Sequence, residues 1–129
     1  MLAEACRDAD RAARPVVVLV VDDDADVRDI VADFLMDFGY SVLRAAGGDE
    51  AMRQIRANPG LDLLITDIRM PDISGIELAQ AVSGSRPGIK IILISGYFVP
   101  QDVGWRVLRK PFRMQELEQA VHDVLRPGV

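Results

Sequence analysis

Four aspartates stand where two apolar runs of the sequence end, and their placement favours a divalent-cation site. Asp22, Asp23 and Asp24 directly follow one apolar run, and Asp67 closes a second. Two carboxylates about 4 Å apart repel each other by roughly 4 kcal/mol at an effective dielectric constant of about 20. A bound divalent cation is a common way to offset such repulsion. We therefore expect a metal ion at these two strand ends.

The chain alternates short apolar runs with helical patterns, which predicts an α/β fold. Apolar runs bounded by turn residues indicate strands, and apolar residues three or four positions apart indicate helices. The expected strands are 16–21, 41–45, 61–66, 89–94 and 105–108. A helix is expected after the first, second, third and fifth strands, the third helix ending before Ser83 and Gly84. This order implies an open parallel sheet with helices on both faces.

Polar side chains follow the carboxyl ends of several expected strands. Besides the aspartates, Ser95 follows the fourth strand and Lys110 follows the fifth. In open parallel sheets, ligands bind outside the carboxyl ends of the strands, at the point where the winding direction reverses. We therefore expect Asp22, Asp23, Asp67, Ser95 and Lys110 to gather at one edge of the sheet.

Length and composition limit the classes of function. The chain has 129 residues, half of them hydrophobic, which suits one folded domain at 15–129 after a flexible polar leader at 1–14. A net charge of -5 disfavours direct binding to nucleic acid or to an anionic membrane. No apolar run approaches the ~20 residues of a membrane helix. The leader lacks the apolar centre of a signal peptide, so a cytoplasmic protein is expected.

Three segments together resemble the receiver domains of bacterial two-component response regulators. They are 18–24, 109–112 and 63–75, the last with the run Asp67-Ile68-Arg69-Met70-Pro71-Asp72-Ile73-Ser74-Gly75. The resemblance covers about 16–126. It implies a flavodoxin-like, doubly wound sheet of five parallel strands in the order 2-1-3-4-5. It also implies phosphoryl transfer from a histidine, on a kinase or a phosphotransfer protein, to an aspartate, followed by signalling through a conformational change.

The resemblance gives three of these residues a part in the transfer. Asp67 would be the phosphoacceptor, because a carboxylate oxygen can attack phosphorus and form an aspartyl phosphate. Lys110 would place a compact positive charge beside one phosphoryl oxygen. Ser95 would donate a hydrogen bond to another. The chain would then assist its own phosphorylation and dephosphorylation without being an enzyme in any wider sense.

The same resemblance implies a Mg²⁺ site, with Mn²⁺ as an alternative ion. Asp23, Asp67 and the backbone carbonyl of Arg69 would bind the ion directly, and Asp22 would orient one of its waters. Oxygen ligands and retained waters suit Mg²⁺. Asp24 has a different expected role, since an aspartate at this position can cap the following helix.

Two departures from the receiver pattern concern the output side of the domain. The segment 96–104 contains two glycines and a proline, so the fourth helix of a receiver should be shortened or missing. The aromatic switch residue three positions before the lysine is replaced by Val107. Tyr97 and Trp105 are candidate substitutes, and the alternative is that both only pack the short connection.

Several alternatives stay open at this point. A Mg²⁺-dependent phosphohydrolase of the haloacid dehalogenase type also begins with a strand that ends in aspartates, although Asp26 stands where that motif has Thr or Val. A second alternative is a receiver fold that acts as an unphosphorylated interaction module. The chain could be a stand-alone regulator or a receiver from a longer protein. The downstream partner is open, and so is dimerisation.

Overall fold

Five parallel strands form one sheet in the computed structural model, which describes residues 15–96 and 103–125. The strand order is β2-β1-β3-β4-β5, and each neighbouring pair is parallel. The strands are β1 Val17–Val21, β2 Ser41–Ala45, β3 Leu63–Asp67, β4 Lys90–Ser95 and β5 Arg106–Arg109. The predicted sheet and its 2-1-3-4-5 order are therefore confirmed.

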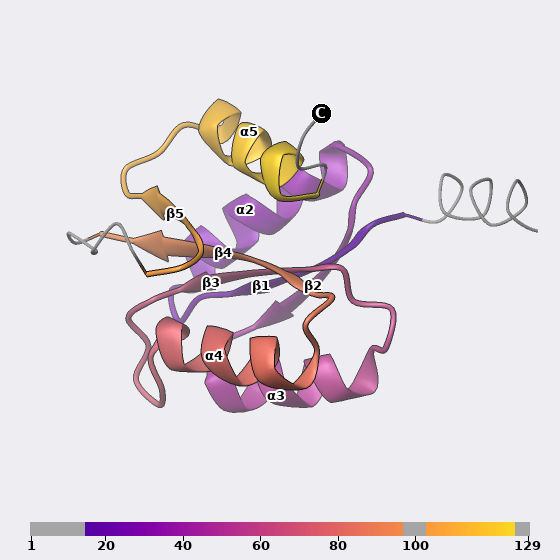
Figure 1. Cartoon of the computed structure of the whole chain (residues 1–129). Coiled ribbons are helices and arrows are strands. Elements are labelled where there is room, and N and C mark those ends of the chain that lie inside the picture. Colours follow the sequence, from indigo (N-terminus) through magenta and orange to yellow (C-terminus); the bar gives the residue numbers. More distant parts are fainter. Residues whose placement is uncertain (1–14, 97–102, 126–129) are drawn as a thin grey trace, which may run out of the picture.

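Four helices of the described residues cover the two faces of this sheet. They are α2 Ala25–Asp37, α3 Gly48–Ala57, α4 Gly75–Ser85 and α5 Met114–Leu125. Helices α2 and α5 lie over one face and α3 and α4 over the other (Figure 1). Because both faces are covered, all five residues of the central strand β3 are buried.

Successive residues of the strands enter opposite halves of the core. Leu19, Leu64 and Leu93 pack with α3 and α4, whereas Val18 and Ile65 pack with α2 and α5. This alternation follows from the two-residue period of a strand. It fixes the register of each strand, since a slip by one residue would turn its side chains to the wrong face.

The register aligns the carboxyl ends of the strands. Val21 of β1 pairs with Thr66 of β3, Asp67 of β3 with Ile94 of β4, and Ser95 of β4 with Arg109 of β5. The polar residues that end these strands, or that follow them directly, therefore come to one edge of the sheet, as the sequence predicts.

The start of α2 confirms the expected role of Asp24. Its carboxylate oxygen Oδ1 accepts hydrogen bonds from the backbone N–H groups of Asp26 at 2.9 Å and Val27 at 3.3 Å. These bonds satisfy two of the donors that every helix leaves unpaired at its N-terminus. Asp24 is thus separated from its neighbours Asp22 and Asp23, although the three are consecutive in sequence.

The end of α4 corrects one prediction. The helix continues through Ser83 and Gly84 to Ser85 instead of ending before them. A glycine costs only about 1 kcal/mol in a helix. The next residue, Arg86, donates its backbone N–H to Val82 and its guanidinium to carbonyl oxygens at the end of α3. These contacts join the residue after α4 to the end of α3, and no local pattern encodes them.

The connection between β4 and β5 agrees with the expected loss of a helix. None of the four helices lies in its described part, Gly96 and residues 103–105. Tyr97 lies outside the described residues. Trp105 is half-buried and packs against the core on the α3 and α4 side.

Across the described ranges, no helix is both long and apolar enough to cross a membrane.

Candidate functional site

Three aspartates from the ends of β1 and β3 form one carboxylate cluster. Asp22 is 2% exposed and Asp67 is 7% exposed, whereas Asp23 is open to solvent. One carboxylate oxygen from each residue lies within 4.8 Å of the other two. The three predicted metal-binding carboxylates are therefore brought together, and we call them the aspartate cluster.

Lys110 reaches the same cluster from the end of β5. Its Nζ lies 3.2 Å from Oδ2 of Asp67 and 3.7 Å from Oδ2 of Asp22. Its backbone N–H donates to the carbonyl oxygen of Ser95 at 2.7 Å, which holds the end of β5 against the end of β4. Three carboxylates and one ammonium group leave these four side chains with a net charge of −2.

The negative charge of the Asp22 carboxylate is only partly compensated by its surroundings. Burial raises the pKa of Asp22, and repulsion from Asp67 and Asp23 adds to the increase. A hydrogen bond from the Asp24 backbone and the charge of Lys110 only partly oppose it. Oxygen Oδ1 accepts the Asp24 N–H at 2.9 Å, but the buried Oδ2 has no hydrogen-bond partner among the described residues. A cation at this position would satisfy that oxygen.

Lys110 is held in its charged form by the two buried carboxylates. Partial burial by itself would lower the pKa of its ammonium group, but the combined attraction of Asp22 and Asp67 is larger and raises the pKa. The amine therefore remains a fixed positive charge beside Asp67. Such a charge can stabilise negative oxygens that arrive in the same place.

The donor set of the aspartate cluster fits a hard divalent cation. All three side chains offer carboxylate oxygens, which are the ligands that Mg²⁺ and Ca²⁺ prefer. The lack of a hydrogen bond to Oδ2 of Asp22 and the net charge of −2 both favour binding of a dication. The loop after β3 lies beside the cluster, because the Arg69 N–H donates to Oδ1 of Asp67 at 3.3 Å.

Ser95 lies at the same edge of the sheet as the aspartate cluster. It is 2% exposed and ends β4. Strand β4 is the neighbour of β3, which ends at Asp67, and the residue before Ser95, Ile94, pairs with Asp67. The structure thus brings together all five of the predicted strand-end residues. The roles of the Ser95 hydroxyl and of the Arg69 carbonyl oxygen stay predictions.

A glycine closes the loop that follows Asp67. The Gly75 N–H donates to the Ile68 carbonyl oxygen at 2.8 Å. A Cβ atom added to Gly75 would collide with the backbone carbonyl oxygen of Asp67, and it would come within 2.9 Å of the Cα of Ile68. Gly75 is therefore required by close approach of two backbone segments, and its neighbour in that contact is the central aspartate of the cluster.

Comparison with known proteins decides the family of this chain. The family model described as "Response regulator receiver domain" matches residues 18–122. The chain belongs to the response regulator receiver family. As a receiver it has a phosphoacceptor role in two-component signalling, as the sequence predicts, and receivers bind Mg²⁺ at an acidic pocket of this kind. The phosphohydrolase alternative is not favoured.

Individual relatives agree with this assignment. The receiver is 32% identical to the response regulator receiver protein CpdR of Brucella abortus, with 84% of this chain and 95% of CpdR covered. Among solved structures, a CheY-like receiver of Methanospirillum hungatei is 29% identical with a TM-score of 0.80, over 87% of this chain and 94% of that one. TrrA of Thermotoga maritima, solved with Mg²⁺ and a beryllium fluoride, is 32% identical with a TM-score of 0.78, over 85% and 99%.

Other curated relatives are longer than this receiver. The chain spans 49% of a transcriptional regulatory protein of Bacillus subtilis and 12% of a sensor kinase of Brucella abortus. The receiver fold is thus found in these relatives as part of larger proteins.

Asp72 is a residue of the receiver that the motif analysis did not single out. It lies in the loop between β3 and α4, and its carboxylate accepts the backbone N–H groups of Gly48 at 3.1 Å and Asp49 at 2.9 Å. These groups begin α3, whose own N-cap residue, Gly47, has no side chain to offer. The long sequence separation hides this contact, and the glycine pair at the start of α3, which offers no capping side chain, is the one signal that could have revealed it.

The contacts of Asp72 give the receiver a testable acid response. Hydrogen bonds from the Asp49, Gly48 and Ile73 backbone lower the pKa of Asp72 to about 2, below the ordinary value of 3.8. The ionised carboxylate therefore stabilises the fold above about pH 4, and this stabilisation is lost as the pH falls toward 2. Melting curves of wild type and Asp72→Ala, from neutral pH down to about pH 2, should converge at the acid end. A midpoint difference independent of pH would contradict the assignment.

Proposed function

We propose that Asp67 is the phosphoacceptor of this receiver and that Asp22, Asp23 and Lys110 assist the transfer. The observation that carries the proposal is the position of the Asp67 carboxylate, which lies inside the aspartate cluster with Oδ2 at 3.2 Å from the Lys110 amine. In the transfer, a carboxylate oxygen of Asp67 forms a bond to phosphorus while the phosphorus–nitrogen bond of a phosphohistidine breaks. The electron pair of that bond stays on the imidazole.

The metal of the site is proposed to be Mg²⁺, with Mn²⁺ able to replace it. Asp23, Asp67 and the Arg69 carbonyl oxygen would bind the ion, and Asp22 would orient one of its waters. When bound, the ion supplies charge neutralisation for the phosphoryl oxygens. The buried oxygen Oδ2 of Asp22, which accepts no hydrogen bond, supports this proposal, and so does the Mg²⁺ complex recorded for the Thermotoga relative.

Lys110 and Ser95 are proposed to contact the phosphoryl group once it is on Asp67. The Lys110 amine is already placed and charged for an incoming anionic oxygen. Ser95 is at the end of the strand next to β3, so a hydrogen bond from its hydroxyl would carry the state of Asp67 to the connection that follows β4. That connection contains the segment 96–104, whose two glycines and proline depart from the sequence pattern of typical receivers.

Removing the Lys110 amine should separate metal binding from phosphoryl transfer. Lys110→Ala is expected to slow phosphorylation by a small phosphodonor about 100-fold, because a preorganised charge at the transferring group is lost. The same change should tighten Mg²⁺ binding, since the ion no longer competes with an ammonium group beside Asp67. Calorimetric Mg²⁺ titration and a time course of adduct formation measure the two effects. Lys90→Ala, at the exposed first residue of β4, is the control, and an equal effect there would refute the role.

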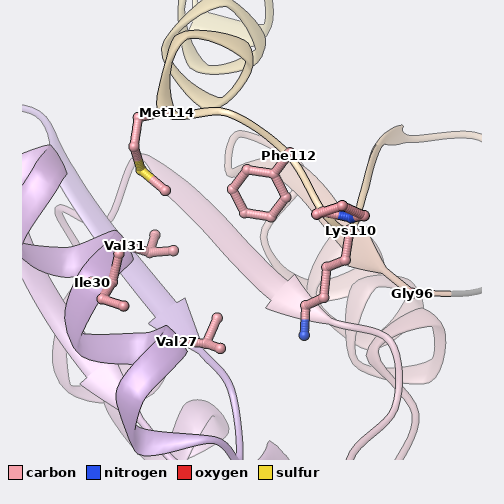
Figure 2. Close-up of a pocket in the computed structure, with 8 residues that line it drawn as sticks. Val27, Ile30, Val31, Gly96, Lys110, Phe112 and Met114 are labelled. Carbon is pink, nitrogen blue, oxygen red and sulfur yellow. The ribbon is translucent and has the colours of Figure 1, made fainter.

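The partner surface is proposed to lie beside Lys110, because a phosphodonor protein must bring its histidine to Asp67. An open groove of about 530 Å³ lies there, between α2 and the segment 110–114. Figure 2 shows Val27, Ile30 and Val31 of α2 on one side and Phe112 and Met114 on the other. Ile30 is 57% exposed, the largest fraction for a large apolar side chain in the described residues. We propose that an apolar helix face of a histidine kinase or phosphotransfer protein binds this groove.

A charge placed in the groove should affect transfer from proteins only. Ile30→Asp is expected to slow transfer from a phosphorylated histidine protein by about tenfold or more, because apolar contact area is lost at the interface. Phosphorylation by acetyl phosphate should stay within about twofold of wild type, since this donor needs no groove. Time courses with both donors measure the difference. Equal slowing with both would show that the variant damages the site itself.

The wider role follows from these local proposals. We propose that residues 15–129 act as the receiver and 1–14 as a leader, in the cytoplasm, with signalling through contact with a downstream protein. The chain would catalyse nothing beyond its own phosphorylation and dephosphorylation.

The experiment that tests the function is incubation with acetyl phosphate and Mg²⁺, followed by intact mass measurement. The expected result is a single phosphoryl adduct that hydroxylamine removes and that chelation of Mg²⁺ prevents. Continuous hydrolysis of a phosphate ester would instead support the phosphohydrolase.

A further inference from the structure

The loop after the phosphoacceptor is attached to the rest of the protein at two points. At its base, the Gly75 N–H donates to the Ile68 carbonyl oxygen at 2.8 Å. At its tip, the Asp72 carboxylate accepts the Gly48 and Asp49 N–H groups of α3, which lie 24 and 23 residues earlier in the sequence. Between these two points lies Arg69, whose N–H donates to Oδ1 of Asp67 at 3.3 Å.

The neighbouring glycines show that the tip of the loop fits closely against α3. A Cβ atom on Gly47 would lie 3.2 Å from both carboxylate oxygens of Asp72. One on Gly48 would lie 2.5 Å from Cγ1 of Ile73, a distance that real Cβ contacts do not reach. The start of α3 is therefore shaped to receive Asp72 and Ile73, and the carboxylate has both of its oxygens engaged there.

Asp72 also orders its own segment of the loop. Its Oδ1 accepts the backbone N–H of Ile73 at 2.9 Å as well as that of Gly48, so one carboxylate joins three backbone donors. Without this carboxylate, the tip of the loop would lose its hydrogen bonds to α3 and keep only the apolar packing of Met70 and Ile73. The segment that would lose its second attachment is the one that contacts Asp67 through Arg69.

We propose that Asp72 is a positioning residue for the aspartate cluster, acting by fixing the loop that carries Arg69 against the start of α3. The inference rests on the proposed function, in which the Arg69 carbonyl oxygen and the Asp67 carboxylate bind the same ion. Asp72 touches neither the ion nor the phosphoryl group. Its effect is to hold the Arg69 backbone in one place, so that the ligands do not have to be ordered when the ion binds.

The competing explanation is that Asp72 only stabilises α3 as a cap. The opposite end of α3 provides a matched control. There, the Arg86 guanidinium donates to the carbonyl oxygens of Ile55 at 2.6 Å, Asn58 at 3.2 Å and Pro59 at 3.0 Å. Arg86 thus binds three backbone groups at the C-terminal end of α3, compared with the two that Asp72 binds at its start, but from outside the loop that follows Asp67. If Asp72 acted only by stabilising α3, then removing either side chain, Asp72 or Arg86, should have the same kind of effect.

The test compares Asp72→Ala, Asp72→Asn and Arg86→Ala with wild type in melting, Mg²⁺ titration calorimetry and adduct formation with acetyl phosphate. Asp72→Ala should weaken Mg²⁺ binding and slow phosphorylation by about tenfold each. Asp72→Asn, which keeps one acceptor oxygen, should lie between it and wild type. Arg86→Ala should lower the melting midpoint and leave Mg²⁺ affinity within about twofold of wild type.

Two outcomes would overturn the proposal. One is Mg²⁺ affinity and rate at the wild-type level in Asp72→Ala despite a lowered midpoint, which would make Asp72 a helix cap only. The other is an equal loss of Mg²⁺ affinity in Arg86→Ala. If wild type binds Mg²⁺ but takes no phosphoryl group, the proposed function fails, while the Mg²⁺ titrations still decide the role of Asp72.

Discussion

Asp67→Asn is expected to abolish the phosphoryl adduct formed with acetyl phosphate and Mg²⁺. An amide oxygen is a poor nucleophile toward phosphorus, and the variant also removes one charged ligand from the aspartate cluster. The amide keeps nearly the same shape. Its one oxygen can still accept the Arg69 N–H in the place of Oδ1, and only the bond from the Lys110 amine to Oδ2 is lost. The loss should therefore be chemical, with the fold retained. Intact mass measurement of the folded variant is the assay.

A second aspartate supplies the control for this experiment. Asp37 is exposed at the end of α2, away from the strand ends that carry the cluster. Asp37→Asn should form the adduct at the wild-type rate. If Asp67→Asn still gains a hydroxylamine-sensitive adduct, the acceptor is another carboxylate, with the exposed Asp23 the first to examine.

Gly75→Ala should produce a large loss of stability, because a Cβ on Gly75 would lie closer to other atoms than one on Gly47, Gly48 or Gly84. The new Cβ would collide with the Asp67 backbone, which is buried at the end of the central strand and cannot move aside cheaply. Overpacking typically costs about 1–3 kcal/mol, and contact with fixed backbone places this change at the upper end of that range. The free energy of unfolding in urea measures the loss. We expect phosphorylation to fall as well, since the displaced group belongs to the phosphoacceptor.

Another glycine of α4 gives the matched comparison. A Cβ on Gly84 meets no described atom within 4 Å, and this residue lies inside the same helix. Gly84→Ala should stabilise the receiver by up to about 1 kcal/mol, because alanine is the better helix former. Similar losses in both variants would indicate a general intolerance of α4 to alanine and would remove the special role of Gly75.

The sheet and the five strand-end residues could be predicted from the sequence because their signals are local. An apolar run that ends in Asp22 or Asp67 indicates both a buried strand and the edge at which its side chain will stand. Parallel pairing then brings these ends together without any further information. The division between Asp24 and its neighbours was also predictable, since helix capping depends on a few consecutive residues.

The contacts that sequence reasoning missed join residues far apart in the chain. Asp72 caps a helix that begins 24 residues earlier, and Arg86 contacts the end of that helix 31 residues before it. Neither Asp72 nor Arg86 is marked by periodicity, and the pattern predicts the end of α4 three residues before Ser85, where the helix ends. Close backbone approach also leaves no trace in a single sequence beyond the presence of a glycine such as Gly75 or Gly48.

The central claim is that the phosphoryl group of the donor is transferred to Asp67 of the aspartate cluster and to no other residue. The most direct measurement is peptide mass spectrometry of the wild-type protein after acetyl phosphate treatment, with the acyl phosphate converted by hydroxylamine into a stable mark on the modified carboxylate. We expect one mark, on Asp67, that forms only when Mg²⁺ is present. A mark on Asp22 or Asp23 instead, or one that forms equally well after chelation of Mg²⁺, would contradict it.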